Sequence, residues 1–158
     1  MSANLHEIAE FLWLEADLLD QKDYEGWLDL WDEEGIYVIP IDRESGDHKA
    51  RLNYAYDDAA MRRMRIRRLT SGESVSARSA GVTIRTVSRF RRLEDTEGSA
   101  IRVRCAQNLT EFRNAKSRSY VADVTFALRP VSGSFRILEK EVLLGNSTDA
   151  LAGITFLP

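Results

Sequence analysis

A chain of 158 residues is long enough to bury a real core in one domain, because folding at this size removes roughly 70% of the unfolded surface from water. With 44% hydrophobic residues, 30% charged residues and only 3 prolines, the composition excludes a disordered tail. A formal net charge of −3 gives no overall attraction to nucleic acid or anionic lipid, so we expect neither as a partner.

The sequence also bears on cellular location. No stretch approaches the length of an apolar membrane span, and the first residues, MSANLHEIAEF, lack the basic and hydrophobic regions of a secretory signal. The single cysteine, Cys105, excludes an internal disulfide and is typical of a reducing compartment. We therefore expect a cytoplasmic protein without a membrane anchor, in which Cys105 is a small buried residue rather than a reactive thiol.

The first expected element is a helix over residues 4–21, where apolar residues recur at helical spacing. Its core-facing arc consists of Leu5, Ile8, Ala9, Leu12, Ala16 and Leu19. Glu15 lies between this arc and a second apolar stripe. We expect an arginine or a backbone donor as its partner, because an unpaired carboxylate there is costly. Trp13 falls on the polar side, either as a surface residue or as an anchor for a partner subunit.

A short second helix is expected next, with Asp23 as its N-cap and Gly35 as its end. Its apolar side consists of Trp27, Leu28, Leu30 and Trp31. Residues 36–41 are rich in β-formers and predict a strand that Pro40 ends or places at a sheet edge.

Residues 42–51 predict a polar loop that contains His48. Asp57 and Asp58 then supply negative charge at the start of a helix that runs to about Leu69. Its later turns carry five arginines in seven residues, which are Arg62, Arg63, Arg65, Arg67 and Arg68. Since this number is too large for one solvated stripe, we expect some of them to pair with carboxylates inside the fold or across an interface.

Four long β segments follow, at roughly 81–93, 100–112, 117–129 and 135–144, and their hairpins predict an antiparallel sheet. Arg85, Arg89 and Arg91 line one side of the first segment, which predicts a solvated or interfacial face. A helical part within residues 4–69, a sheet part within 81–144 and a tail over 145–158 predict a single α+β domain over 1–158. Its helices pack on one face of a strongly curved, mainly antiparallel sheet.

Few residues are available for catalysis. With only two histidines, His6 and His48, a two-histidine iron site would need both brought together, and a Rieske cluster would need a second cysteine. What remains is carboxylate and tyrosine chemistry in an apolar pocket. The candidates are Tyr24, Tyr37, Tyr54, Tyr56, Asp57 and Asp123, with Tyr54, Asp57 and Asp123 as the preferred catalytic set.

Three stretches resemble one known family along nearly the whole chain. They are "FLWLEADLLDQKDYEGWLDLW" from Phe11, "YAYDDAAMRRMRIRRL" from Tyr54 and "FRILEKEVLLGN" from Phe135. A further landmark is an acidic pair, Glu33 and Glu34, followed by Tyr37 three residues before Pro40. In this order and spacing they are similar to the small (beta) subunit of bacterial aromatic-ring-hydroxylating dioxygenases.

The resemblance implies the cone-like, cystatin-like α+β fold shared by nuclear transport factor, ketosteroid isomerase and scytalone dehydratase. It also implies a non-catalytic structural role in aromatic compound catabolism. In this family a separate alpha subunit carries the Rieske cluster and the mononuclear iron, and beta subunits trimerise to form the base of an α3β3 assembly. We therefore expect no cofactor or metal in this chain, a homotrimer, and a catalytic alpha subunit as its partner.

For the subunit interface we select Trp13, Arg65, Arg68, Arg85 and Arg89. Two other functions stay open. A stand-alone isomerase or dehydratase of the same fold, acting on a small apolar carbonyl compound, would need a deep pocket that ends in a carboxylate or a tyrosine. A binding or scaffold domain would instead form ligand-free dimers with a flat exposed sheet.

Overall fold

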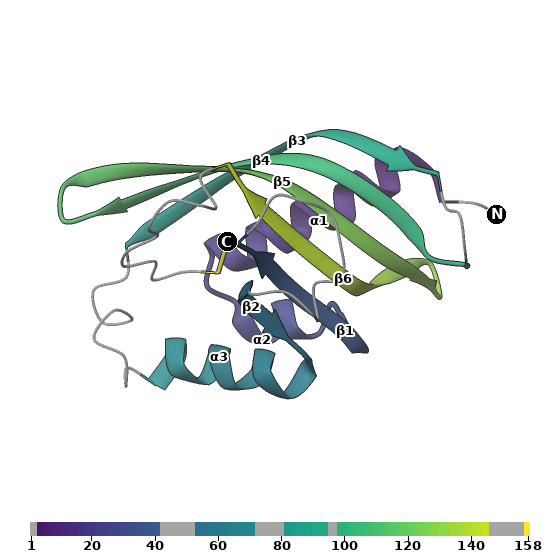
Figure 1. The fold of residues 1–158 in the computed structure, drawn as a ribbon, viewed down its shortest axis with the longest axis horizontal. Coiled ribbons are helices and arrows are strands. Elements are labelled where there is room, and N and C mark those ends of the chain that lie inside the picture. Colours follow the sequence, from purple (N-terminus) through teal and green to yellow (C-terminus); the bar gives the residue numbers. More distant parts are fainter. Residues whose placement is uncertain (1–2, 42–52, 72–80, 95–97, 146–156) are drawn as a thin grey trace.

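The computed structural model describes residues 3–41, 53–71, 81–94, 98–145 and 157–158. Within these ranges, helices lie on one side of a single curved six-stranded sheet (Figure 1). The helices are α1 (Leu5–Asp20), α2 (Tyr24–Leu28) and α3 (Ala59–Ser71). The strands are β1 (Trp31–Pro40), β2 (Asn53–Asp57), β3 (Val82–Leu93), β4 (Ile101–Arg113), β5 (Lys116–Val131) and β6 (Ser134–Leu144). The predicted α+β class is confirmed.

The sheet has the strand order β2-β1-β6-β5-β4-β3. Strands β3 to β6 form an antiparallel meander, and β1 and β2 are also antiparallel. Strands β1 and β6 run parallel. The sheet is thus mainly antiparallel, as predicted. Its one parallel junction joins strands far apart in the chain, so the hairpin pattern carries no signal for it.

Helix α1 begins at a capping box. The side chain of Asn4 accepts a hydrogen bond from the Glu7 amide at 2.9 Å, and the Glu7 carboxylate accepts one from the Asn4 amide at 3.0 Å. The predicted core arc is buried from Ile8 to Leu19, but Leu5 is 44% exposed because it lies in the first turn, before the helix reaches the sheet. The helix packs across the sheet and contacts β3.

The stretch between α2 and β1 differs from the prediction. Asp23 caps α2 as expected, since its carboxylate accepts a hydrogen bond from the Gly26 amide at 3.0 Å. However, α2 ends at Leu28, and Trp31 is the first residue of β1 rather than a helical residue. Gly35 does not end the helix but lies inside β1, because pairing of Trp31 with Ile137 of β6 draws this segment into the sheet.

Gly35 is required by close packing. A Cβ atom there would lie 2.7 Å from the carbonyl oxygen of Ile137 and 2.8 Å from Cε3 of Trp31. We expect Gly35→Ala to lower the free energy of unfolding by about 1–3 kcal/mol, measured by urea denaturation, because the added methyl group forces strand and ring apart. Ser134→Ala, at an exposed strand end, is the control and should change it by less than about 0.5 kcal/mol. Equal unfolding midpoints for Gly35→Ala and the unmodified chain would contradict this packing argument.

Strand β2 was not expected at all. Asp57 is its last residue, paired in register with Tyr37, and is not the N-cap of α3. That role belongs to Asp58 alone, whose carboxylate accepts a hydrogen bond from the Met61 amide at 3.0 Å. A five-residue edge strand shows too little alternation to be predicted from sequence. Its residues therefore looked like the segment that precedes the next helix. The predicted polar loop over 42–51 and His48 lie outside the described residues.

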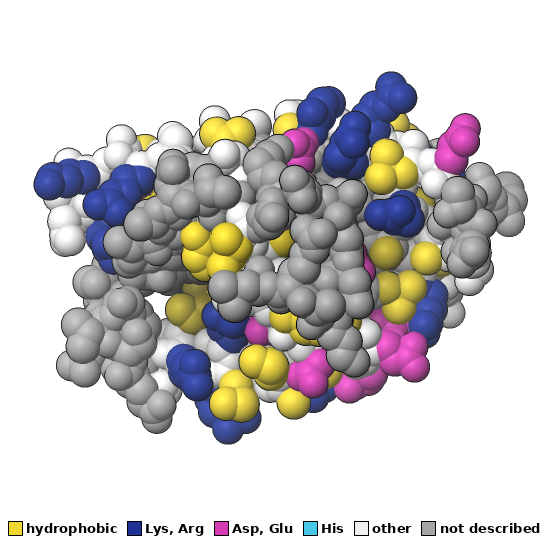
Figure 2. Space-filling model, viewed as in Figure 1, with side chains coloured by type: hydrophobic (Ala, Val, Ile, Leu, Met, Phe, Trp, Pro, Cys, Tyr) yellow, Lys and Arg dark blue, Asp and Glu magenta, His cyan; other side chains and the backbone are white. Residues whose placement is uncertain are grey.

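The core lies between α1, α2 and the inner face of the sheet. Cys105 is 1% exposed, so the prediction of a small buried cysteine is confirmed, and burial raises the pKa of its thiol to about 12. Figure 2 shows Lys and Arg side chains gathered over α3, where Arg63, Arg67 and Arg68 are exposed. In the described part of the chain, no helix combines the length and apolar character needed to span a membrane.

Candidate functional site

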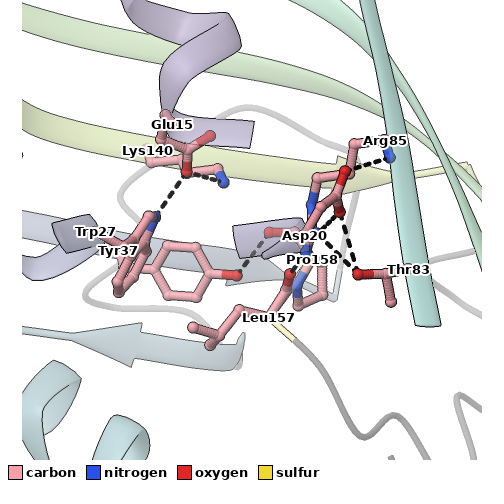
Figure 3. Close-up of polar contacts among 9 residues, drawn as sticks. All are labelled: Glu15, Asp20, Trp27, Tyr37, Thr83, Arg85, Lys140, Leu157 and Pro158. Carbon is pink, nitrogen blue, oxygen red and sulfur yellow. Dashed lines mark hydrogen bonds and ion pairs between the residues drawn. The ribbon is translucent and has the colours of Figure 1, made fainter. Parts of the chain in front are cut away.

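The concave side of the sheet, closed by α1 and α2, contains a buried ion pair. The Nζ of Lys140 on β6 lies 2.6 Å from Oε1 of Glu15 on α1, and the two side chains are 0% and 2% exposed. The indole of Trp27 donates a second hydrogen bond to the same carboxylate oxygen at 2.8 Å (Figure 3). Glu15 therefore has the partner that its position demands, but this partner is a lysine and an indole rather than the predicted arginine or backbone donor.

Burial lowers the pKa of Lys140, and the neighbouring Glu15 carboxylate opposes that shift. The Lys140 ammonium lies 5.8 Å from the centre of the Tyr37 ring and 5.7 Å from that of the Phe126 ring. Cation–π interactions with these two rings therefore help to stabilise its charge. We call Glu15, Trp27, Tyr37 and Lys140 the interior cluster. Lys140 leaves no signal in the sequence pattern, because a bulge at Leu138 shifts the alternation of β6 and hides which face Lys140 occupies.

Three aromatic rings form the wall of this interior. Trp27 contacts Trp31 and Tyr37 edge to face, with ring centres 5.3 and 6.0 Å apart. The Tyr37 hydroxyl donates a hydrogen bond to the carbonyl oxygen of Pro158 at 3.0 Å, so this phenol is already bonded within the chain. Desolvation raises the pKa of Tyr37 above its ordinary value.

The raised pKa of Tyr37 predicts a pH dependence. The buried phenol keeps its proton while the unfolded chain loses it above about pH 10, so stability from this group is present below pH 10 and lost above it. Between pH 10 and 11.5 we expect the unmodified chain to lose up to about 1.4 kcal/mol of unfolding free energy per pH unit more than Tyr37→Phe. Denaturant titrations at several pH values measure this difference. Parallel pH profiles for the two proteins would contradict it.

A second group of polar residues joins the end of α1 to β3. The Asp20 carboxylate accepts hydrogen bonds from the Thr83 hydroxyl at 3.1 Å and the Arg85 amide at 2.8 Å, and it forms an ion pair with the Arg85 guanidinium. That guanidinium also donates to the carbonyl oxygen of Leu157 (Figure 3). We call Asp20, Thr83 and Arg85 the mouth cluster, and it holds the 157–158 segment in place.

The mouth cluster corrects the prediction for Arg85. Its side chain is 1% exposed, so it does not belong to a solvated strand face. The alternation of β3 places Thr83 and Arg85 on the inner face, and Asp20, 65 residues away in sequence, supplies the carboxylate that makes burial possible. A pairing over that separation leaves no local signal.

The arginines of α3 partly meet expectation. Arg65 forms a two-pronged pair with Asp57, with nitrogen–oxygen distances of 2.6 and 3.0 Å, and this hydrogen bonding raises the pKa of Arg65. Arg62 is 3% exposed, and its guanidinium donates to main-chain carbonyls of Gly35, Asp57 and Asp32. Burial lowers the pKa of Arg62 to about 10. The two arginines fasten α3 to β1 and β2.

The preferred catalytic set is not brought together. Asp57 is fully buried at the end of β2 and is occupied by Arg65, whereas Tyr54 is 41% exposed on the same strand. Asp123 lies on the opposite face of the sheet from Val124, three strands from β2, and pairs with Arg89. These groups therefore cannot act on one substrate as general acid and base.

The remaining interface candidates lie at least partly at the surface. Trp13 is 43% exposed, and its indole donates to the Val87 carbonyl at 2.9 Å while its ring packs edge to face on Phe90. Arg68 is exposed near the end of α3, and Arg89 is half exposed beside Asp123. Among the described residues, no three His, Cys, Asp or Glu side chains come together in a way that could hold a metal ion.

Comparison with known proteins gives a consistent family. The sequence profile of the ring hydroxylating beta subunit matches residues 14–149. The anthranilate 1,2-dioxygenase small subunit of Acinetobacter baylyi is 28% identical over 96% of this chain and 96% of its own length. The small oxygenase component of the p-cumate 2,3-dioxygenase system of Pseudomonas putida is 30% identical over 87% of this chain and 77% of its own length.

Solved structures agree on the fold. The beta subunit of benzoate 1,2-dioxygenase from Burkholderia mallei superposes with a TM-score of 0.80 at 23% identity, covering 99% of both chains. An NTF2-like protein with a cystatin-like fold from Novosphingobium aromaticivorans superposes with a TM-score of 0.61 at 19% identity, covering 94% of this chain and 84% of its own. At these identities the superpositions establish the cone-like fold alone.

Proposed function

This chain belongs to the ring hydroxylating beta subunit family, as its sequence motifs indicated, and from that membership we propose that it is the structural subunit of an aromatic-ring dioxygenase. It carries no active site of its own in this proposal. Its task is to support a catalytic alpha subunit that holds the Rieske cluster and the mononuclear iron. A cytoplasmic location is part of the proposal and is supported by the single cysteine.

One observation carries the structural role: the titratable groups of the interior cluster are each hydrogen-bonded within the chain. Glu15 is bonded to Lys140 and Trp27, and the Tyr37 hydroxyl is bonded to Pro158. A general acid or base must reach a proton on its substrate, and a buried group that is already paired within the chain cannot do so without breaking its own pair. The same pairing disfavours the isomerase or dehydratase alternative, whose pocket would occupy this space.

We further propose a homotrimer within an α3β3 assembly, with exposed cationic and aromatic side chains at its interfaces. Support comes from Trp13 and Arg68, which are exposed on α1 and α3. Arg65 and Arg89 are half exposed, so each can contact a neighbouring subunit while keeping its own carboxylate partner. Arg85 is left out of this interface because its guanidinium is buried.

Co-purification tests the proposal. A tagged copy of this chain, co-expressed with the alpha subunit from the same gene cluster, should retain that subunit through affinity and size-exclusion chromatography. Arg68→Glu should weaken the association about tenfold or more, because a reversed charge at an interface meets like charge. Arg104→Glu, an exposed change on β4 away from α3, is the matched control. A stable monomer that fails to retain the alpha subunit would contradict the proposal.

A further inference from the structure

We propose that the basic tip of the β4–β5 hairpin of one copy of this chain docks into an acidic cleft of a second copy. This inference rests on the homotrimer proposed above and names the two surfaces that join its copies. The hairpin tip is residues 113–118, and its basic residues are Arg113, Lys116 and Arg118. The acidic cleft lies between α2, the start of β1 and the start of α3, and its carboxylates are Glu25, Asp29, Asp32 and Glu33.

The hairpin tip projects beyond the rest of the sheet (Figure 1). Strand β5 pairs with β4 from Lys116 onward but with β6 only from Ala122 onward, and the pairing of β3 with β4 ends at Phe112. Among the described strands, residues 116–119 therefore pair with β4 alone. A two-stranded hairpin on its own is marginally stable at best, so this projection gains stability from a partner surface.

The basic residues of the tip are free to pair with another molecule. Lys116 and Arg118 are exposed, Arg113 is half-buried, and none of the three forms an ion pair within the described part of the chain. Figure 2 shows Lys and Arg side chains at the left end of the molecule, where the hairpin projects. The tip thus presents cations without countercharges.

The acidic cleft, with a volume of about 200 Å³, presents carboxylates without countercharges. Glu25 and Asp29 are exposed, and neither carboxylate has a partner among the described residues. The other two carboxylates already form ion pairs at 2.8 Å, Asp32 with Arg129 and Glu33 with Arg63. The arginines of the wall are likewise occupied, because Arg63 bonds Glu33, Arg136 bonds the Asp29 carbonyl, and Arg62 bonds main-chain carbonyls.

Two buried donors in the wall of the cleft have no acceptor. Nε1 of Trp31 and Nε of Arg62 lack a hydrogen-bond partner in the described structure, although the two residues are only 6% and 3% exposed. The Arg62 guanidinium lies 4.1 Å from the centre of the Trp31 ring, so the two groups line the cleft together. Buried N–H groups normally find an acceptor. A docked turn brings carbonyl oxygens for these donors as well as cations for Glu25 and Asp29.

The positions of the two surfaces favour a second copy as the occupant. The hairpin tip and the acidic cleft lie at different ends of the molecule, so the tip meets a cleft of another copy rather than its own (Figure 1). A contact between two different surfaces passes from copy to copy and closes into a ring when the rotation allows it. A cyclic trimer is such a ring, and each copy in it gives one hairpin and receives one.

Charge reversal tests the contact. Lys116→Glu and Glu25→Lys should each raise the concentration at which half of the chain is trimeric by at least tenfold, measured by sedimentation velocity, because each brings like charges together. Arg104→Glu on β4 and Glu10→Lys on α1 make the same charge changes at exposed positions outside both surfaces. These two control variants should assemble as the unmodified chain does.

The double variant Lys116→Glu/Glu25→Lys restores opposite charges at every contact, so it should recover the assembly that each single variant loses. No recovery would overturn the proposal, because the two positions would then not meet. If the unmodified chain is trimeric and both single variants assemble equally well, the hairpin–cleft contact is wrong but the homotrimer stands. A chain that is monomeric throughout would contradict the homotrimer itself. Intact trimers of Lys116→Glu that lose the alpha subunit would assign the hairpin to that subunit and overturn docking between copies.

Discussion

Replacing Lys140 with methionine is expected to lower the free energy of unfolding by about 3–5 kcal/mol, because it leaves the Glu15 carboxylate buried without a countercharge. Both partners are almost fully buried, at 0% and 2% side-chain exposure, so solvent cannot screen the loss. The indole of Trp27 remains as a donor but carries no charge. Urea denaturation followed by tryptophan fluorescence measures the change.

The control for Lys140→Met adds Glu15→Gln. The amide oxygen keeps an acceptor for the Trp27 indole and removes the buried charge, so the double variant should recover most of the lost stability. Additive losses in the double-mutant cycle would contradict a coupled buried pair. They would mean instead that each side chain contributes through packing alone.

Asp20→Ala is expected to lower the free energy of unfolding by about 3–4 kcal/mol, since it strips the buried Arg85 guanidinium of its carboxylate. The Arg85 amide and the Thr83 hydroxyl lose their acceptor at the same time. Because Arg85 also holds Leu157, we expect protease cleavage of the 157–158 region to speed up in this variant. Thermal and urea unfolding give the stability change.

Asp17→Ala is the matched control, on the same helix one turn earlier, where the side chain is exposed. It should change the free energy of unfolding by less than about 0.5 kcal/mol. A loss of stability in Asp20→Ala no larger than in Asp17→Ala would contradict the role of the mouth cluster.

The sequence predicted those helices and strands whose residues show a regular hydrophobic pattern. The 3.6-residue spacing in α1 and the two-residue alternation in β4 and β5 placed these elements because one continuous face of each is buried. The burial of Cys105 was predicted from the same alternation in β4. The cone-like fold came from motif order, which the family match supports.

Contacts between distant residues set the features that sequence did not predict. Trp31 and Gly35 look helical locally but lie in β1, because Trp31 and Ile36 on either side of this stretch pair with β6, about 100 residues later. Arg85 looks solvent-facing because its partner Asp20 lies on another element. Lys140 lies beyond a bulge that inverts the apparent face of β6. In each case tertiary pairing overrides local pattern.

Native mass spectrometry of this chain mixed with its alpha subunit tests the central claim most directly. The account predicts one complex with equal numbers of the two chains, in which all iron stays with the alpha subunit after the chains are separated. An isolated monomer of this chain that ignores the alpha subunit, or that retains iron itself, would contradict the claim.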